Sequence, residues 1–174
     1  VEKHKIFRLP NTIDENLFFS KTAILTEGKQ RRIAIVAALE KRKGMHLLPL
    51  ALERIPKELR KYIRIDIAGD GPLKSELENY LKLSGYSFNL YGFLSSKEIM
   101  HLLLDSDGFL LPSLVDPNPL SAIEALALGL PLLLSNNCGN ISECLDQNLN
   151  GWTFDPTNSS EFSKAINDWL FKPI

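Results

Sequence analysis

The sequence predicts an α/β domain, a doubly wound parallel sheet of about six strands with helices on both faces. Three observations predict it. Short runs of aliphatic and β-branched residues alternate with segments of helical period along most of the 174 residues. The apolar runs end at turn-forming residues, as at Gly69 to Pro72. No hairpin signal joins one apolar run to the next, so neighbouring strands are expected to be parallel.

Composition limits the classes of function. An apolar share of 44% is enough for a real core, and 20 basic residues nearly balance 21 acidic ones. Such a balance gives no strong field for nucleic acid, so no nucleic-acid partner is expected. The longest apolar run, 125–134, is interrupted by Gly129 and Pro131 and is too short to cross a bilayer. Cys138 and Cys144 match no zinc spacing and are expected to be free cytosolic thiols.

The first part of the chain is expected to lead into the sheet. Residues 6–10 are predicted to form a short strand and 11–14 a turn, while 15–30 show no clear period and are expected to be a loop. Residues 32–39 are almost continuously small or β-branched, which is typical of a strand buried on both faces. A basic turn follows at 40–44, and then a helix is expected over 45–54, bent early by Pro49.

The rest of the chain continues the alternation. Ser95 is expected to begin a helix in a capping box with Glu98. A helix over 73–83 should turn Leu73, Leu77, Tyr80 and Leu81 inward, and a closing helix should run from Ser159 or Ser160 to Leu170. The expected strands are 62–68, 88–91, 108–111, 132–134 and 152–154, with the last at an edge of the sheet.

The helix after the 108–111 strand carries an unusual carboxylate. Asn118 is predicted to be its N-cap and Pro119 its first helical residue. Between Ala122 and Leu128 every side chain except Glu124 is apolar, so this helix is expected to be covered on all sides. A carboxylate there is costly unless something pairs with it. An anion at the free N–H groups of the helix start and a pair of hydroxyls at Glu124 would fit these features.

This stretch resembles the donor-binding motif of retaining glycosyltransferases of family 4, two-domain enzymes with the GT-B fold. Their motif is a Glu, seven residues, a second Glu, and a small-residue run ending in Gly-x-Pro; here it reads Asp116, seven residues, Glu124, and 125–131. The run Pro10-Asn11-Thr12-Ile13-Asp14 is similar to the opening of the family's second domain. The resemblance covers Pro10 to about Trp169. It implies that 1–174 is the Rossmann-like, nucleotide-sugar-binding C-terminal half of a GT-B fold, with 1–30 as the entry strand and loop from a missing N-terminal domain.

The resemblance also implies roles for individual residues. Glu124 would hold the ribose hydroxyls and Asp116 the sugar, and these two are the candidate catalytic residues. Lys43 would neutralise the diphosphate; as part of a basic turn it has a surface interpretation too, but beside Glu124 the phosphate role is favoured. The remaining candidate donor contacts are Gly69 and Gly71 in a Gly-x-Gly-Pro turn, Phe93 where the family's backbone holds the base, and Leu120 and Ser121 at the helix start.

Three departures from the family pattern bear on donor binding. Ala38 stands where the family usually has an arginine, five residues before the lysine. Pro119 replaces a common glycine and offers no N–H to a phosphate. Asp116 is one methylene shorter than the usual glutamate, and its alternative role is that of an Asp-Pro turn residue. All three positions belong to contacts that the resemblance assigns to diphosphate binding and catalysis.

The resemblance implies an enzyme that transfers a sugar from a UDP- or GDP-sugar to a glycan or lipid-linked acceptor. The nucleotide-sugar is a substrate, and neither a cofactor nor a metal is expected. This chain alone is expected to be inactive, because the acceptor would be held by the missing domain. A cytoplasmic location is expected, and peripheral association of the full-length protein with the inner face of a membrane stays open.

Two other interpretations stay open. The first is a degenerate, non-catalytic nucleotide-binding module, which Ala38 and Pro119 keep in consideration. The second is a nicotinamide oxidoreductase, which is weakened because no Gly-x-Gly-x-x-Gly follows the first long strand. The base, the sugar, the acceptor and the oligomeric state are not readable from the sequence.

Overall fold

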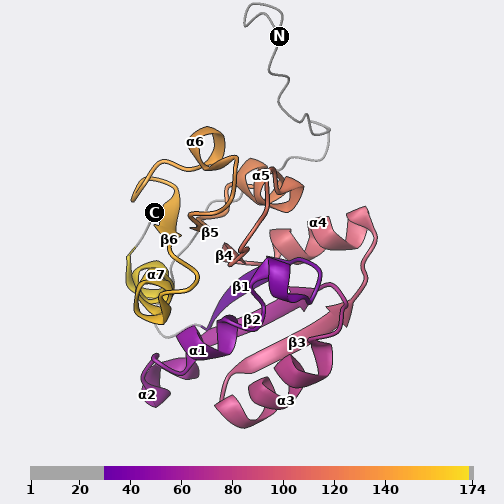
Figure 1. Cartoon of the computed structure of the whole chain (residues 1–174), viewed down its shortest axis with the longest axis vertical. Helices are drawn as coiled ribbons and strands as arrows, with labels where there is room; N and C mark the ends of the chain where they lie inside the picture. Colours follow the sequence, from indigo (N-terminus) through magenta and orange to yellow (C-terminus); the bar gives the residue numbers. More distant parts are fainter. Residues whose placement is uncertain (1–29, 173–174) are drawn as a thin grey trace, which may run out of the picture.

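A computed structural model describes residues 30–172, which form one six-stranded parallel sheet flanked by helices (Figure 1). The sheet has the order β3-β2-β1-β4-β5-β6, so the predicted doubly wound architecture is confirmed. All five neighbouring pairs of strands are parallel. The strands are β1 (Arg31–Val36), β2 (Ile63–Ala68), β3 (Ser87–Gly92), β4 (Gly108–Leu111), β5 (Leu132–Ser135) and β6 (Gly151–Phe154).

The strand order reverses between β1 and β4. From β1 the chain winds outward through β2 to β3, and it then returns to the other side of β1 and continues through β4 to β6. Strand β4 pairs with β1 through Ile33↔Gly108 and Ala34↔Phe109. In open sheets of this kind, ligands bind beyond the carboxyl ends of the strands at such a reversal. The fold therefore points to the loops that follow β1 and β4.

Two apolar layers enclose the sheet. One contains Ile33, Ile35 and Ile65 of the sheet together with residues from α1 (Leu48–Leu52), α3 (Lys74–Ser84) and α7 (Ser159–Phe171). The other contains Phe109 and Leu111 with residues from α4 (Ser96–Leu104), α5 (Leu120–Ala127) and α6 (Ile141–Cys144). The remaining short helices are the 3-10 helix η3 (Lys41–Lys43) and α2 (Lys57–Arg60).

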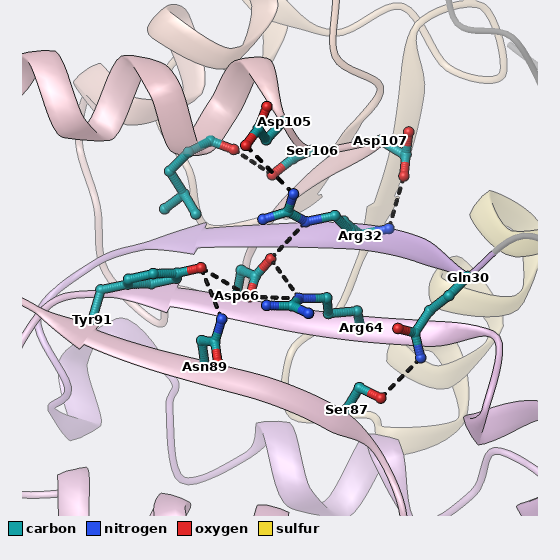
Figure 2. Close-up of polar contacts among 11 residues, drawn as sticks. Gln30, Arg32, Arg64, Asp66, Ser87, Asn89, Tyr91, Asp105, Ser106 and Asp107 are labelled. Carbon is teal, nitrogen blue, oxygen red and sulfur yellow. Dashed lines mark hydrogen bonds and ion pairs between the residues drawn. The ribbon is translucent and has the colours of Figure 1, made fainter.

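A polar network covers part of the second sheet face, over β1, β2 and β3 (Figure 2). The Asp66 carboxylate on β2 is fully buried, and it accepts hydrogen bonds from Arg32 Nε at 2.9 Å and Arg64 Nε at 3.1 Å. The Tyr91 hydroxyl adds a longer contact to Asp66 at 3.4 Å. The aliphatic parts of the Arg32 and Arg64 side chains and the Tyr91 ring thus shield this part of the sheet from water.

Several sequence predictions are confirmed closely. Strand β4 has the predicted bounds, and β6 lies at an edge of the sheet. The Ser95–Glu98 capping box of α4 is present. On α3, Leu77 and Leu81 are buried, and Leu73 and Tyr80 pack against the same core.

Other expectations are wrong in an instructive way. Strand β1 ends at Val36, not Leu39. The Ala37 amide still bonds to Ala68 O at the end of β2, but the Leu39 amide bonds to Asp70 O in the turn that follows β2. The helix expected over 45–54 is shorter, because only α1 forms within that range; η3 ends before it and α2 begins after it. Pro49 lies in the first turn of α1, where a proline fits best, so the helix begins near it and is not bent by it.

Helix α5 also differs from expectation. Its N-cap is Pro119, in an extended conformation with ψ 110°, and its first helical residue is Leu120; Asn118 is therefore not the cap. The helix is not covered on all sides, since only Ala122 and Ala125 within its bounds are buried and Leu120 is 51% exposed. The strand expected at 6–10, the turn at 11–14 and the loop from residue 15 to residue 29 lie outside the described residues.

Candidate donor site at the carboxyl edge

The loops after β1 and β4 interlock at the reversal point of the sheet. The Arg42 carbonyl accepts from the amides of Leu114 at 2.9 Å and Val115 at 3.3 Å. Gly44 follows in the left-handed region with φ 71°, and a Cβ on it would lie only 1.8 Å from the Pro112 carbonyl oxygen. A residue with a side chain has no room there, so glycine allows the two loops to meet.

This contact brings Lys43 and Asp116 together. Lys43 Nζ donates to Asp116 Oδ2 at 2.5 Å, and the two side chains are only 17% and 9% exposed. Both residues were predicted at this edge, and the structure places them there as a shielded ion pair. Their direct contact was not predicted, because the resemblance assigned them to different parts of the ligand.

Glu124 lies one turn inside α5 and is half-buried. Burial raises the pKa of its carboxyl above the ordinary value. Within residues 30–172, no side chain or amide pairs with this carboxylate. At the start of the same helix, Leu120 is exposed and Ser121 partly buried, and their backbone N–H groups have no acceptor inside the helix. The half-buried Glu124 carboxylate, a hydrogen-bond acceptor, and the amide donors of Leu120 and Ser121 therefore lie on one short helix.

The turn after β2 packs tightly against the turn after β1. Cβ atoms on Gly69 and Gly71 would lie 1.9 Å from the Ala37 oxygen and 2.5 Å from the Leu39 oxygen. Both glycines have positive φ. Their demonstrated role is close backbone packing, which brings this turn to the candidate site; a contact with nucleotide stays a prediction.

Phe93 is displayed outward from a short fixed loop. Before it, the Gly92 carbonyl accepts from Gly69 N at 2.7 Å, and after it Ser95 caps α4. Leu94 packs against the second apolar layer, whereas the Phe93 side chain is 84% exposed. Phe93 is therefore an exposed apolar ring at the carboxyl edge of the sheet, and its contact with a base stays a prediction.

The loop after β5 completes the wall beside Asp116, and sequence reasoning did not single out its contacts. Gly139 N donates to Asp116 O at 2.9 Å, and Asn140 Nδ2 donates to the Pro119 carbonyl at 3.2 Å. Asn140 occupies the N-cap of α6, yet its side chain makes no cap hydrogen bond. An asparagine before a short helix would have suggested a cap, and nothing local signals its bond to Pro119.

The departures from the family pattern are visible here. Ala38 is exposed on the turn after β1. Arg42 is exposed and pairs with Glu40 at 2.8 Å, while Lys41 is exposed as well. Of the three basic residues of η3, Lys43 is thus the one with a shielded side chain.

Both cysteines are free and buried. Burial, aided by the Asp116 carboxylate, raises the pKa of Cys138 to about 12, and burial also raises the pKa of Cys144. Since the thiolate is the reactive form, we expect both to react with a thiol reagent at pH 8 more than about tenfold more slowly in the native protein than in urea. Rapid labelling of the native chain in a thiol-titration assay would contradict this packing.

In residues 30–172, no group of three or more His, Cys, Asp or Glu side chains could hold a metal ion. Over the same residues, no helix combines the length and apolar character needed to cross a membrane.

Comparisons with known proteins agree with this arrangement. Among solved structures, the apo lipopolysaccharide outer core galactosyltransferase WaaB aligns with a TM-score of 0.72 and 21% identity, over 87% of this chain and 44% of that one. Anabaena HepE, crystallised with UDP and glucose, aligns with a TM-score of 0.70 and 21% identity, over 83% of this chain and 40% of that one. These likenesses show a shared fold, that of GT-B glycosyltransferases.

Sequence comparisons are more specific. The amylovoran biosynthesis glycosyltransferase AmsK of Erwinia amylovora is 34% identical over 131 residues, covering 70% of this chain and 31% of that protein. Spore coat protein SA of Bacillus subtilis is 31% identical over 148 residues, covering 79% of this chain and 39% of that protein. The chain thus spans less than half the length of these relatives. Residues 19–173 match the family model described as glycosyl transferases group 1, so the chain belongs to that family.

Proposed function

We propose that this chain is the donor-binding domain of a retaining glycosyltransferase that uses a UDP- or GDP-sugar. One observation carries the proposal: Lys43 from the loop after β1 pairs with Asp116 in the loop that leads from β4 into α5, at the reversal point of the sheet. The crystal structure of HepE with UDP and glucose supports a nucleotide-sugar as the ligand of this fold. The acceptor would be a glycan or a lipid-linked saccharide.

In this proposal each part of the donor meets a suitable group. Lys43 and the N–H groups of Leu120 and Ser121 take the diphosphate, where a preplaced cation stabilises the charge that grows on the leaving group. Asp116 accepts from a sugar hydroxyl through the oxygen that Lys43 does not use. Glu124 accepts from the ribose hydroxyls, and the loop of Phe93 contacts the base. The nucleotide-sugar is the substrate, and the proposal includes neither a cofactor nor a metal.

Catalysis requires more than this chain in our proposal. Holding donor and acceptor in line supplies roughly 7–11 kcal/mol of a barrier, and the described domain has one wall of such a site. We therefore expect residues 1–174 to bind a nucleotide-sugar without transferring it, in the cytoplasm, where free buried thiols persist. The rival hypothesis of a non-catalytic nucleotide-binding module rests on exposed Ala38 and on Pro119, which lacks an N–H.

Glu124→Gln tests the ribose contact. We expect it to weaken binding of a nucleoside diphosphate by about 1–3 kcal/mol, the value of a hydrogen bond to a charged group. We also expect the variant to melt at a higher temperature than the parent at pH 7. The raised pKa means that the folded state disfavours the ionised carboxyl of Glu124. The parent therefore loses folding stability as pH rises above the ordinary pKa of Glu, and below that pKa it loses none. The gain in melting temperature should therefore vanish near pH 3.

The control is a second ligand that lacks the ribose hydroxyls. A 2′,3′-dideoxynucleoside diphosphate lacks both hydroxyls, so it should bind the parent and Glu124→Gln equally well. Calorimetric titration of both proteins with both ligands separates the ribose contact from a general change in the site. Equal loss of affinity for the two ligands would show that Glu124 does not contact the ribose.

A further inference from the structure

We propose that Asp116, paired with Lys43, lowers the affinity of the site for the free nucleoside diphosphate more than its affinity for the nucleotide-sugar, and that Asp116 thereby promotes release of the leaving product. This inference rests on the proposed function and goes beyond it by assigning Asp116 a role in product discrimination. It starts from the contact of 2.5 Å between the Lys43 ammonium and the Asp116 carboxylate.

The surroundings of the pair hold it in place. The backbone of Asp116 is anchored by the parallel bridge Asp116↔Cys138, which includes the bond from Gly139 N to Asp116 O at 2.9 Å. Lys43 is fixed by η3, whose Arg42 carbonyl binds the β4 loop. Side-chain exposures of 17% and 9% leave little water to screen the two charges. If either side chain left the pair, the other would be a shielded charge without a counter-ion, which is costly.

A diphosphate that binds Lys43 therefore also meets Asp116. The cation attracts the phosphates, while the carboxylate repels them from almost the same position. The net attraction at this point is smaller than that of an isolated lysine. The attraction to Lys43 and the repulsion by Asp116 both grow with the charge on the nearer phosphate, so Asp116 removes more binding energy from the ligand with the higher charge.

Donor and product differ in that charge. In a nucleotide-sugar the terminal phosphate is esterified to the sugar and carries one negative charge. Transfer breaks the bond between the anomeric carbon and the phosphate oxygen, and the electron pair stays on that oxygen. The free terminal phosphate has a second pKa near 6, so at pH 7 it carries close to two charges. Asp116 therefore repels the product more strongly than the donor, and product release is a step that often limits turnover.

The test is Asp116→Asn, with dissociation constants measured for UDP, UDP-glucose, GDP and GDP-mannose on the full chain. We expect the variant to bind the free diphosphate of the preferred base about tenfold more tightly than the parent, with a steeper dependence on salt. The ratio of the constant for the free diphosphate to that for its sugar should fall. Asp116→Ser, whose hydroxyl can still accept from Lys43, should show the same tightening if the asparagine variant fails to fold.

Glu40→Gln is the matched control, because it also removes one carboxylate from an ion pair, here in the turn that carries Lys43. Glu40 pairs with Arg42 at 2.8 Å, but the side chains are 36% and 53% exposed, so water screens the pair and little change in affinity is expected. An equal effect of both variants would show a general field and overturn the inference.

The other outcomes are equally decisive. If Asp116→Asn weakens only the nucleotide-sugars and leaves free diphosphates unchanged, Asp116 is a sugar contact and has no role in product discrimination. If the parent binds the diphosphates but the variant binds them more weakly, Asp116 acts by positioning Lys43. If the parent binds none of the four nucleotides, the proposed function itself fails.

Discussion

Replacing Lys43 by methionine is expected to weaken binding of a nucleoside diphosphate by about 10- to 100-fold, or roughly 1.5–3 kcal/mol for a charged hydrogen bond. Binding of the bare nucleoside should change little, because it has no phosphate charge to lose. The reason is geometric: Lys43 is the shielded cation of η3, at the reversal point of the sheet. Since Asp116 loses its partner, the variant should also melt below the parent.

Arg42→Met provides the matched control, since Arg42 is the preceding residue and is exposed. We expect it to change diphosphate affinity by less than about twofold at 0.15 M salt, where surface charges are screened. Calorimetric titration of the parent and of each variant with a diphosphate and its nucleoside gives the six constants needed. If both variants lose the same affinity, the basic turn acts as a diffuse surface patch and Lys43 has no special contact.

Of the variants proposed here, Gly44→Ala is expected to lose the most free energy of unfolding, about 3 kcal/mol or more. The loss comes from steric overlap of the new Cβ and from backbone strain. Its Cβ would lie 1.8 Å from the Pro112 oxygen, so the β1 and β4 loops would have to separate. For a domain of this size the melting temperature should fall by about 6–12 °C. Separating the loops would also pull Lys43 away from Asp116, so diphosphate affinity should fall in the molecules that stay folded.

Gly85→Ala separates the overlap from the strain. Gly85 ends α3 with φ 82°, a value similar to that of Gly44, but a Cβ there meets nothing within 4 Å. It should cost only about 1 kcal/mol, the usual cost of placing a side chain in the left-handed region. Equal destabilisation of both variants in a thermal melt would mean that the interlocked loops add nothing to the strain at Gly44.

The sheet could be predicted from the sequence because its strands are local signals. The strand at 108–111 is a short apolar run between Asp107 and Pro112, and the structure gives it these bounds. Helix α4 was equally readable, since Ser95 and Glu98 form a cap within four residues. In such segments, propensity, periodicity and capping all favour one structure.

The errors arose where contacts between distant segments decide the outcome. Strand β1 ends earlier than predicted, and the Leu39 amide bonds to the turn after β2, which no local pattern shows. Asn118 is a better cap than Pro119 by propensity, yet the structure begins α5 after Pro119, whose carbonyl is held by Asn140. Tertiary contacts overrode the local preference in both cases.

The candidate site was predicted in position but not in detail. Motif spacing placed Lys43, Asp116 and Glu124 after strand ends, and parallel strands place such residues at one edge. The Lys43–Asp116 contact spans 73 positions and depends on Gly44 allowing two loops to meet. Side-chain pairing over that separation follows from the assembled fold and leaves no signal in either segment alone.

The central claim is that a nucleotide-sugar binds at the carboxyl edge between β1 and β4. Titrating isotope-labelled chain with UDP- and GDP-sugars and recording amide chemical shifts tests it most directly. We predict saturable shifts at Lys43 and Gly44, at Phe93, and through the start of α5, and we predict none on α7. Shifts confined to α7 and β6, or no saturable shift with any nucleotide-sugar at millimolar concentration, would contradict the claim.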